Sequence, residues 1–244
     1  MRLLMTEHPP VRTPSPLLLM VSALFVAALV ASNIIAVKIA AVGPFSVPAA
    51  IVIFPLAYLF GDVLTEVWGY RVARMVIWTG FLANIVVVLF IAAAIAIPAD
   101  THYTDQAAYA RILGSTPRLV AASLVAYLLG EFLNAFVLAR LKVATRGRLL
   151  WMRTIGSTLI GQGVDSIVFI SLAFAGTQPL TLLIVIIRDV WVVKVLYEVI
   201  ATPITYAIVT VLKRVEGVDT YDRDTKFAPI PLAALRSLVR GAQS

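Results

Sequence analysis

Long apolar stretches separated by short polar segments account for most of the chain. A bilayer core is about 30 Å thick, and a helix needs roughly 20 residues to cross it. Stretches of this length lie at 17–37, 48–67, 72–97, 119–141, 154–175 and 189–212. The pattern therefore predicts an all-α integral membrane protein with six transmembrane helices.

A shorter apolar run, 179–187, lies between the last two of these stretches. It begins with Pro179 and is followed by Arg188 and Asp189, and it is too short to cross a bilayer. We expect a short interfacial or re-entrant segment that leads into the last helix.

The composition narrows the class of protein. Hydrophobic residues make up 61% of the chain and charged residues only 14%, too few polar side chains to cover a soluble globule. Cysteine is absent and the histidines are His8 and His102, so we expect no disulfide, no metal site and no cofactor. A membrane-embedded enzyme is the least favoured function, because the sequence has no nucleophile or cofactor motif.

The basic residues predict the orientation of the chain in the membrane. The net charge of +7 could suggest nucleic-acid binding, but Lys and Arg lie in short runs between apolar stretches, so we expect no nucleic-acid partner. With six spans both termini lie on one side, and an internal N-terminus places most basic residues in the cytoplasm. We therefore expect a cytoplasmic N-terminal segment (1–16), a transmembrane domain (17–213) and a cytoplasmic basic tail (214–244).

Several ionisable residues lie within the predicted spans. A charge at bilayer depth costs several kcal/mol, so it usually faces the bundle interior and has a partner. Asp62 and Glu66 are four residues apart and share one helix face near the predicted cytoplasmic end. They could form an ordinary helix end paired with Arg71 or Arg74, or they could act in coupling or gating.

Two later spans carry similar groups. Gln162 and Asp165 lie among small residues in the fifth span, a pattern that favours a planar hydrogen-bonding ligand over polar contacts between helices. Lys194 and Glu198 are four residues apart in the sixth span, shortly before Pro203. They form either an ion pair within the helix or part of a binding site beside a proline kink.

The remaining polar residues lie in the first and fourth spans. Asn33 is deep enough to need a partner, whereas Lys38 could extend to the outer interface. Glu131 and Asn134 are three residues apart, and Glu131 needs a cation or a ligand nearby. By residue count, Asn33, Gln162, Asp165, Lys194 and Glu198 form a pocket in the outer half to the middle, with Asp62 and Glu66 closer to the cytoplasm.

Three sets of motifs together resemble the YhhQ family of queuosine precursor transporters, over residues 17–222. They are Ala-Ser-Asn-Ile-Ile-Ala-Val-Lys at 31–38; Gly-Asp-Val-Leu-Thr-Glu-Val-Trp-Gly-Tyr-Arg at 61–71; and the later motifs Gly-Gln-Gly-Val-Asp-Ser at 161–166 and Lys-Val-Leu-Tyr-Glu at 194–198. The resemblance implies a multi-pass importer of 7-deazaguanine bases in the cell inner membrane. It also implies a fold similar to the substrate-binding subunits of energy-coupling-factor vitamin transporters.

The resemblance suggests roles for the polar residues. Asp165 or Glu198 would accept the ring and exocyclic N–H groups of a deazaguanine, and Gln162, Asn33 or Asn134 would bind its carbonyl. The expected substrate-binding set is Asn33, Lys38, Asn134, Gln162, Asp165, Lys194 and Glu198. The expected coupling or gating set is Asp62, Glu66 and Glu131.

The mode of transport has two readings. The chain could be a secondary or facilitated importer, acting alone or as a homo-oligomer in the lipid bilayer. It could instead be a substrate-binding subunit that needs separate energising subunits, because the sequence has no P-loop of its own.

Overall fold

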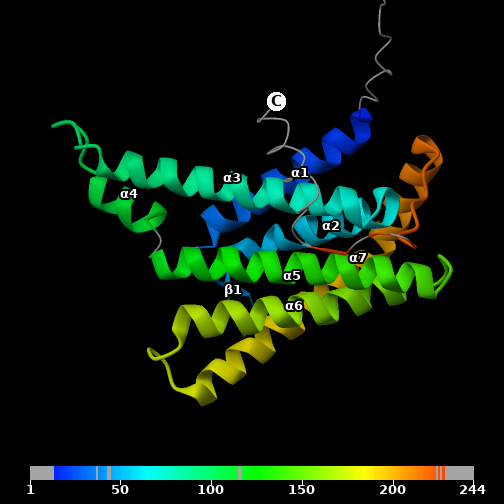
Figure 1. Ribbon diagram of the computed structural model, residues 1–244. Helices are drawn as coiled ribbons and strands as arrows, with labels where there is room; N and C mark the ends of the chain where they lie inside the picture. The colour runs from blue at the N-terminus through cyan, green and yellow to red at the C-terminus, as the bar shows by residue number, and fades with distance from the viewer. Residues whose placement is uncertain are drawn as a thin grey trace, which may run out of the picture.

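The computed structural model describes residues 14–36, 38–42, 45–114, 117–223, 225 and 227–228. These residues form seven α-helices, a 3-10 turn and a two-stranded antiparallel hairpin (Figure 1). The elements in chain order are α1 (Pro16–Ile35), β1 (Ile39–Val42), β2 (Phe45–Pro48), η1 (Ala49–Val52), α2 (Phe54–Trp68), α3 (Tyr70–Ala96), α4 (Gln106–Leu113), α5 (Pro117–Ala144), α6 (Leu150–Phe174) and α7 (Leu180–Glu216).

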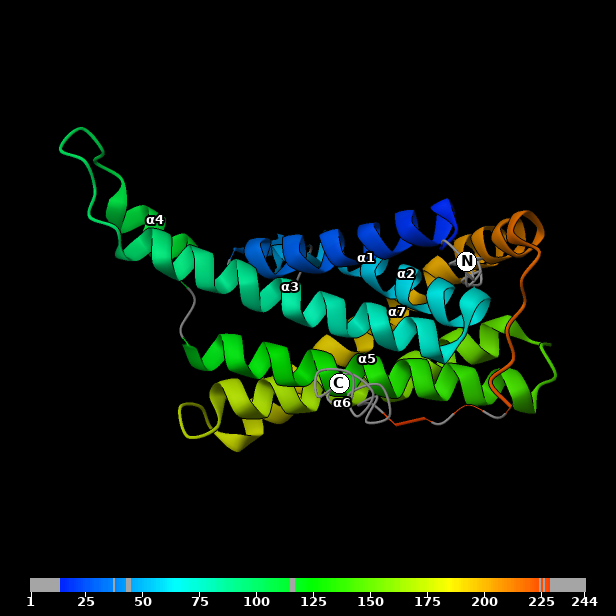
Figure 2. The same ribbon diagram turned by 45° about the horizontal axis from the view of Figure 1, so that its top comes forward.

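The long helices form one bundle around α2. Helices α5 and α6 form the most extensive helix pair, α7 packs on α6 and α2, and α1 and α3 cover the other side of α2. Figures 1 and 2 place the start of α1, the α2–α3 corner, the α5–α6 connection and the end of α7 at one end of the bundle. Helix α4 and the α6–α7 connection lie at the opposite end.

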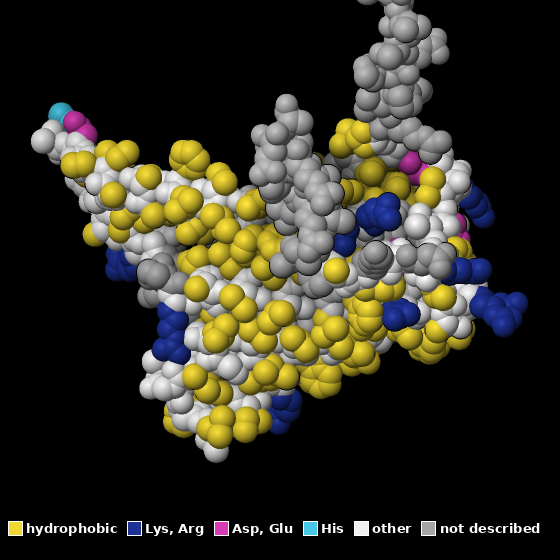
Figure 3. All heavy atoms as spheres, viewed as in Figure 1, with side chains coloured by type: hydrophobic (Ala, Val, Ile, Leu, Met, Phe, Trp, Pro, Cys, Tyr) yellow, Lys and Arg dark blue, Asp and Glu magenta, His cyan; other side chains and the backbone are white. Residues whose placement is uncertain are grey.

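Unlike a soluble protein, the bundle has an apolar surface and buries several charged side chains beside its apolar core. Phe90 is 73% exposed and Ile200 is 72% exposed, whereas Asp62 and Glu66 are both 0% exposed. Figure 3 shows hydrophobic side chains spread along the flank of the bundle. A bundle with apolar flanks and its charged groups inside is suited to a bilayer, because lipid solvates the apolar side chains and protein groups must satisfy the polar ones.

Four described helices are long and apolar enough to cross a membrane, judged by length and composition. They are α1, α3, α6 and the part of α5 from Val120 to Ala144. The predictions at 17–37, 72–97, 119–141 and 154–175 are thereby confirmed as helices. The chain is a helical membrane protein.

The prediction of a separate segment at 179–187 is wrong. Helix α7 runs without a break for 37 residues, from Leu180 to Glu216. Pro179 is its N-cap residue, a position that needs no backbone N–H within the helix. Arg188 and Asp189 form a 2.9 Å ion pair on the exposed helix surface, so these charges do not end the helix.

The second predicted span, 48–67, begins too early. Pro48 is the last residue of β2 and pairs with Ile39, and a 3-10 turn follows before α2 starts at Phe54. Helix α2 therefore has 15 residues and a length of about 22 Å, less than a bilayer core. A short apolar strand and an apolar helix cannot be distinguished by hydrophobicity alone, which explains the error.

The segment after α7 folds back over the end of the bundle. Thr220 N donates to Val67 O (3.2 Å), and Lys142 Nζ donates to Thr220 O (2.7 Å). Phe227 packs between Tyr70 and Phe136, with ring centroids 5.0 and 5.1 Å away.

The same segment caps α3. Gly69, with φ +86°, makes the corner between α2 and α3 and offers no side chain to cap the new helix. Asp222 Oδ2 instead accepts a hydrogen bond from Tyr70 N (2.9 Å). A carboxylate at a helix N-terminus satisfies a free N–H group and interacts favourably with the helix dipole.

Replacing Asp222 with alanine should lower the free energy of unfolding by about 1 kcal/mol, because the start of α3 loses its cap. The measurement is thermal unfolding of the purified protein in detergent, followed by tryptophan fluorescence. Asp105→Ala is the matched control, since Asp105 is the N-cap residue of α4 but its side chain makes no capping hydrogen bond. Equal effects of the two substitutions would contradict the capping role.

Candidate functional site

Three carboxyl groups from three helices meet in the interior of the bundle. Asp62 of α2, Glu131 of α5 and Glu198 of α7 are 0%, 7% and 2% exposed. Asp62 interacts electrostatically with both Glu131 and Glu198. We call these three residues and their neighbours Asn134, Gln162, Asp165, Ser166 and Lys194 the central cluster.

Amide side chains connect the carboxyl groups. Asn134 Nδ2 donates to Asp62 Oδ1 (2.8 Å), and Gln162 is hydrogen-bonded to Glu131. These two bonds use amide hydrogens and leave the amide oxygens pointing to no partner. The amides therefore hold the carboxyl groups in place and add acceptor atoms to the cluster.

Five buried polar atoms of the central cluster have no hydrogen-bond partner among the described residues. They are Asp62 Oδ2, Asn134 Oδ1, Gln162 Oε1, Ser166 Oγ and Glu198 Oε1. Leaving a buried polar atom unpaired costs about 1–3 kcal/mol, so such atoms usually have a function or bind water or a ligand. These atoms come from four helices, α2, α5, α6 and α7, and they make the central cluster the candidate site for a polar molecule.

Two glycines bring α5 and α6 together at the cluster. A Cβ atom on Gly161 would lie 2.7 Å from Asn134 Cβ and 2.9 Å from Gly130 O, and a Cβ on Gly130 would lie 2.7 Å from Asp165 Cβ. Any larger residue would force the helices apart. The small residues noted in the fifth span therefore act with Gly130 to place Asn134, Gln162 and Asp165 side by side.

Lys194 joins α7 to α6 through an ion pair with Asp165. The spacing within the sixth span suggested Glu198 as its partner, but spacing along one helix does not register a residue on a neighbouring helix. Lys194 also hydrogen-bonds Tyr58 of α2 and interacts electrostatically with Glu131. The lysine therefore sits at the edge of the cluster and fixes Asp165.

Asp62 and Glu66 lie in different environments despite their shared helix. Asp62 belongs to the central cluster, whereas Glu66 lies in a network of cations toward the end of the bundle. Arg153 binds both Glu66 oxygens, with Nη2 2.8 Å from Oε1 and Nε 3.3 Å from Oε2. Lys213 Nζ is 2.7 Å and Lys142 Nζ 3.6 Å from Oε1.

These partners differ from the expected Arg71 or Arg74. Arg74 Nη1 donates instead to Ala228 O, in the segment after α7. The actual partners could have been inferred from their predicted depth in the membrane. Glu66, Lys142, Arg153 and Lys213 all lie at or next to the predicted cytoplasmic ends of their spans. The Glu66 network joins α2, α5, α6 and α7.

Asn33 and Lys38 lie outside the central cluster. Asn33 is hydrogen-bonded to Asn84 of α3 and, at 3.4 Å, to Ser123 of α5. The partners of Asn33 are therefore not residues of the central cluster. Lys38 is exposed in the connection between α1 and β1. Ser166, which the sequence did not single out as a ligand, belongs to the cluster and was detectable as the residue next to Asp165.

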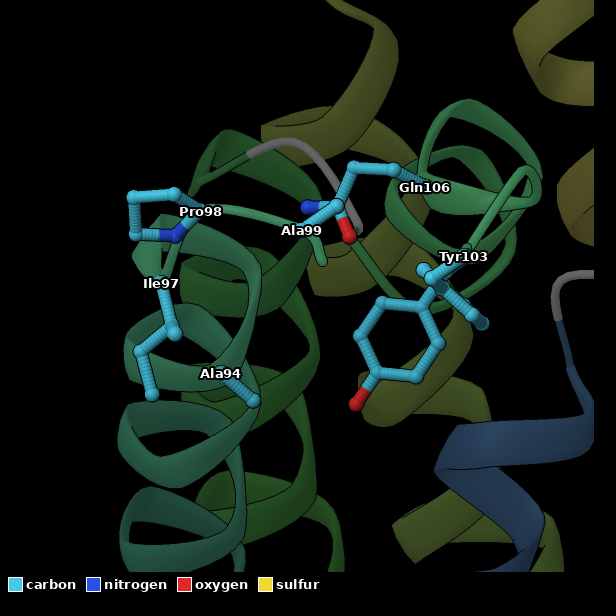
Figure 4. A pocket seen from close by; sticks show the side chains of 7 residues that line it. Ala94, Ile97, Pro98, Ala99, Tyr103 and Gln106 are labelled. Carbon is cyan, nitrogen blue, oxygen red and sulfur yellow. The ribbon is translucent and has the colours of Figure 1, made fainter. Parts of the chain in front are cut away.

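The connection between α3 and α4 forms a separate shallow pocket at the end of α3. Its lining comes from the end of α3, the following loop and α4, and Tyr103 and Gln106 lie at its rim (Figure 4). The central cluster contributes no residue to this pocket. Among the described residues, no group of three or more His, Asp or Glu side chains is arranged to hold a metal ion.

A family model described as "Putative vitamin uptake transporter" matches residues 48–208, which include α2 and most of α7. The chain belongs to this family. The chain is also 27% identical over 157 residues to a Bacillus subtilis (strain 168) protein named "Probable queuosine precursor transporter". That alignment covers 64% of this chain and 69% of the relative, and no solved structure shows a significant match.

These findings confirm the resemblance carried by the sequence motifs. They identify a multi-pass membrane transporter of the vitamin uptake type. The matched region contains all residues of the central cluster and Glu66. Asn33 and Lys38, which precede it, are the two expected site residues that the structure places elsewhere.

Replacing Glu66 with glutamine in this transporter should lower the free energy of unfolding by about 3 kcal/mol or more, because the buried Arg153 would lose its counter-charge. The measurement is thermal unfolding in detergent. Asp189→Asn is the matched control, since its carboxylate pairs with Arg188 on the exposed surface, where ion pairs stabilise little. A Glu66→Gln protein as stable as the control would contradict the structural role of the network.

Asp219 should make the same network sensitive to acid. Burial alone would raise its pKa, but hydrogen bonds from Lys142 and Lys213 outweigh this effect and lower the pKa of Asp219 below its ordinary value. Its contribution to stability is therefore fully present above the ordinary carboxyl pKa of about 4 and is lost as the pH falls through the lowered value.

The expected result is a difference in melting temperature between the wild type and Asp219→Asn that is constant from about pH 7 to pH 5. The difference should shrink below about pH 4. A difference that grows as the pH falls would show that the sign is wrong.

Proposed function

We propose that this transporter imports queuosine precursors, 7-deazaguanine bases in their cyano and aminomethyl forms, for salvage into transfer RNA. The printed name of the Bacillus subtilis relative supports the substrate class. The observation that carries the proposal is the set of five unpaired polar atoms in the central cluster.

The chemistry of the cluster suits a guanine-like base. Such a base presents several N–H donors beside one carbonyl acceptor. Glu198 Oε1, Gln162 Oε1 and Asn134 Oδ1 are acceptors that can take the N–H groups, and the Ser166 hydroxyl can donate to the carbonyl. Asp165 is held by its ion pair with Lys194. It would therefore shape the site, and the base edge would be bound by the other acceptors.

We place this transporter in the cell inner membrane. The proposed topology has six spans, with both termini in the cytoplasm. It is supported by the common end of the bundle where α1 begins and α7 ends. Lys142, Arg153 and Lys213 lie at this end, as expected for the cytoplasmic side.

The proposed coupling or gating roles divide between two places. Glu66 would act as a gate, because its ion pairs join four helices at the cytoplasmic end. Asp62 and Glu131 line the central cluster, so they would act on the substrate or on protons there. Transport is proposed to be secondary or facilitated, with no energising subunit.

The test is uptake of labelled precursor into liposomes that contain only the purified protein. Uptake should occur, and Gln162→Ala should reduce it about tenfold or more, because an acceptor buried against the base is lost. Gln178→Ala is the matched control, since Gln178 is exposed in the α6–α7 connection.

A complementation assay in cells completes the test. The chain should restore queuosine in the transfer RNA of a cell that can neither make nor import the precursor. Restoration in cells without uptake in liposomes would favour the substrate-binding subunit. Failure with every precursor form, despite good expression in the membrane, would remove the proposed function.

A further inference from the structure

The central cluster has more carboxyl groups than cationic groups. Among the described residues it contains the carboxyl groups of Asp62, Glu131, Asp165 and Glu198 and one ammonium group, that of Lys194. Lys194 pairs with Asp165 and can balance one negative charge however it is shared. The nearest other cations, Arg153, Lys142 and Lys213, are bound by Glu66 and Asp219.

The unpaired atoms show the same excess in hydrogen-bonding terms. Four of the five are oxygens that accept hydrogen bonds: Asp62 Oδ2, Asn134 Oδ1, Gln162 Oε1 and Glu198 Oε1. The fifth, Ser166 Oγ, is the one that always carries a hydrogen to donate. A matching ligand therefore has many donors, few acceptors and a positive charge.

The two precursor forms differ in these properties. A primary alkylamine is protonated at neutral pH, like that of lysine, so the aminomethyl form carries a positive charge and three further donors. The cyano form is neutral, and its nitrile offers an acceptor. An acceptor placed against unpaired carboxyl oxygens gains no hydrogen bond and meets like partial charges.

We infer that the central cluster selects the cationic aminomethyl precursor over the neutral cyano form, with Asp62 as the partner of the ammonium group. The inference rests on the proposed function. Asp62 is assigned because Asn134 holds its Oδ1 in place while Oδ2 stays unpaired, so the carboxylate is oriented and still available. Glu198 and Gln162 remain for the N–H edge across the base.

The test is equilibrium binding of both forms to the purified full-length protein in detergent. The aminomethyl form should bind about tenfold tighter or more, the ratio expected when a charge-assisted hydrogen bond is gained. The 7-hydroxymethyl analogue has the same size but no charge, and it should bind more weakly than the aminomethyl form. This comparison needs no variant, so it stands even if a substituted protein fails to fold.

Asp62→Asn tests the assigned partner. The substitution keeps the oxygen that accepts from Asn134, removes the charge and should reduce the ratio of the two affinities about tenfold. Asp100→Asn makes the same chemical change in the exposed outer loop and should leave the ratio unchanged.

Three outcomes separate the claims. Equal or tighter binding of the cyano form would overturn the selectivity and leave the proposed function standing. An unchanged ratio in a folded Asp62→Asn protein would overturn the role of Asp62. Binding of neither precursor would overturn the proposed function itself.

Discussion

The structure depends on the requirement that charges within a bilayer-sized bundle find their partners inside the protein. Glu66 shows the requirement most fully. Its two oxygens, both buried, hold Arg153 of α6 and Lys213 of α7, and Lys142 of α5 completes the group. One carboxylate of α2 therefore connects three other helices. Moving α6 would leave the buried Arg153 without this counter-charge, whereas Lys142 and Lys213 would keep Asp219.

The central cluster meets the same requirement only in part, and this difference distinguishes Asp62 from Glu66, which both lie in the C-terminal half of α2. Glu66 is surrounded by cations, whereas Asp62, about one helical turn closer to the middle, keeps an unpaired oxygen beside Glu131 and Glu198. A fully paired network stabilises one arrangement of helices. A partly paired one costs stability unless a ligand or a proton completes it, which is the property expected of a transport site.

The sequence was a good guide to the long helices and to the residue types in the site. The 20-residue apolar stretches, the family motifs and the buried positions of Asp62, Glu131, Gln162 and Glu198 all follow from polar residues in an apolar pattern. It misjudged the segments where hydrophobicity is ambiguous. The strand ending at Pro48 and the first turns of α7 are both apolar, so hydrophobicity could not reveal that one is a strand and the other is continuous with the last helix.

The sequence by itself determined that this protein lies in a membrane, that its motifs resemble those of queuosine precursor transporters and which polar side chains its interior must accommodate. The sequence suffices for this because the free-energy cost of a charge in a bilayer applies to every helix arrangement. Only the tertiary structure decided the partners. Asn33 pairs with Asn84, Lys194 with Asp165 and Glu66 with Arg153. Contacts between helices depend on how the helices are rotated and how closely they approach, which spacing along one helix does not encode.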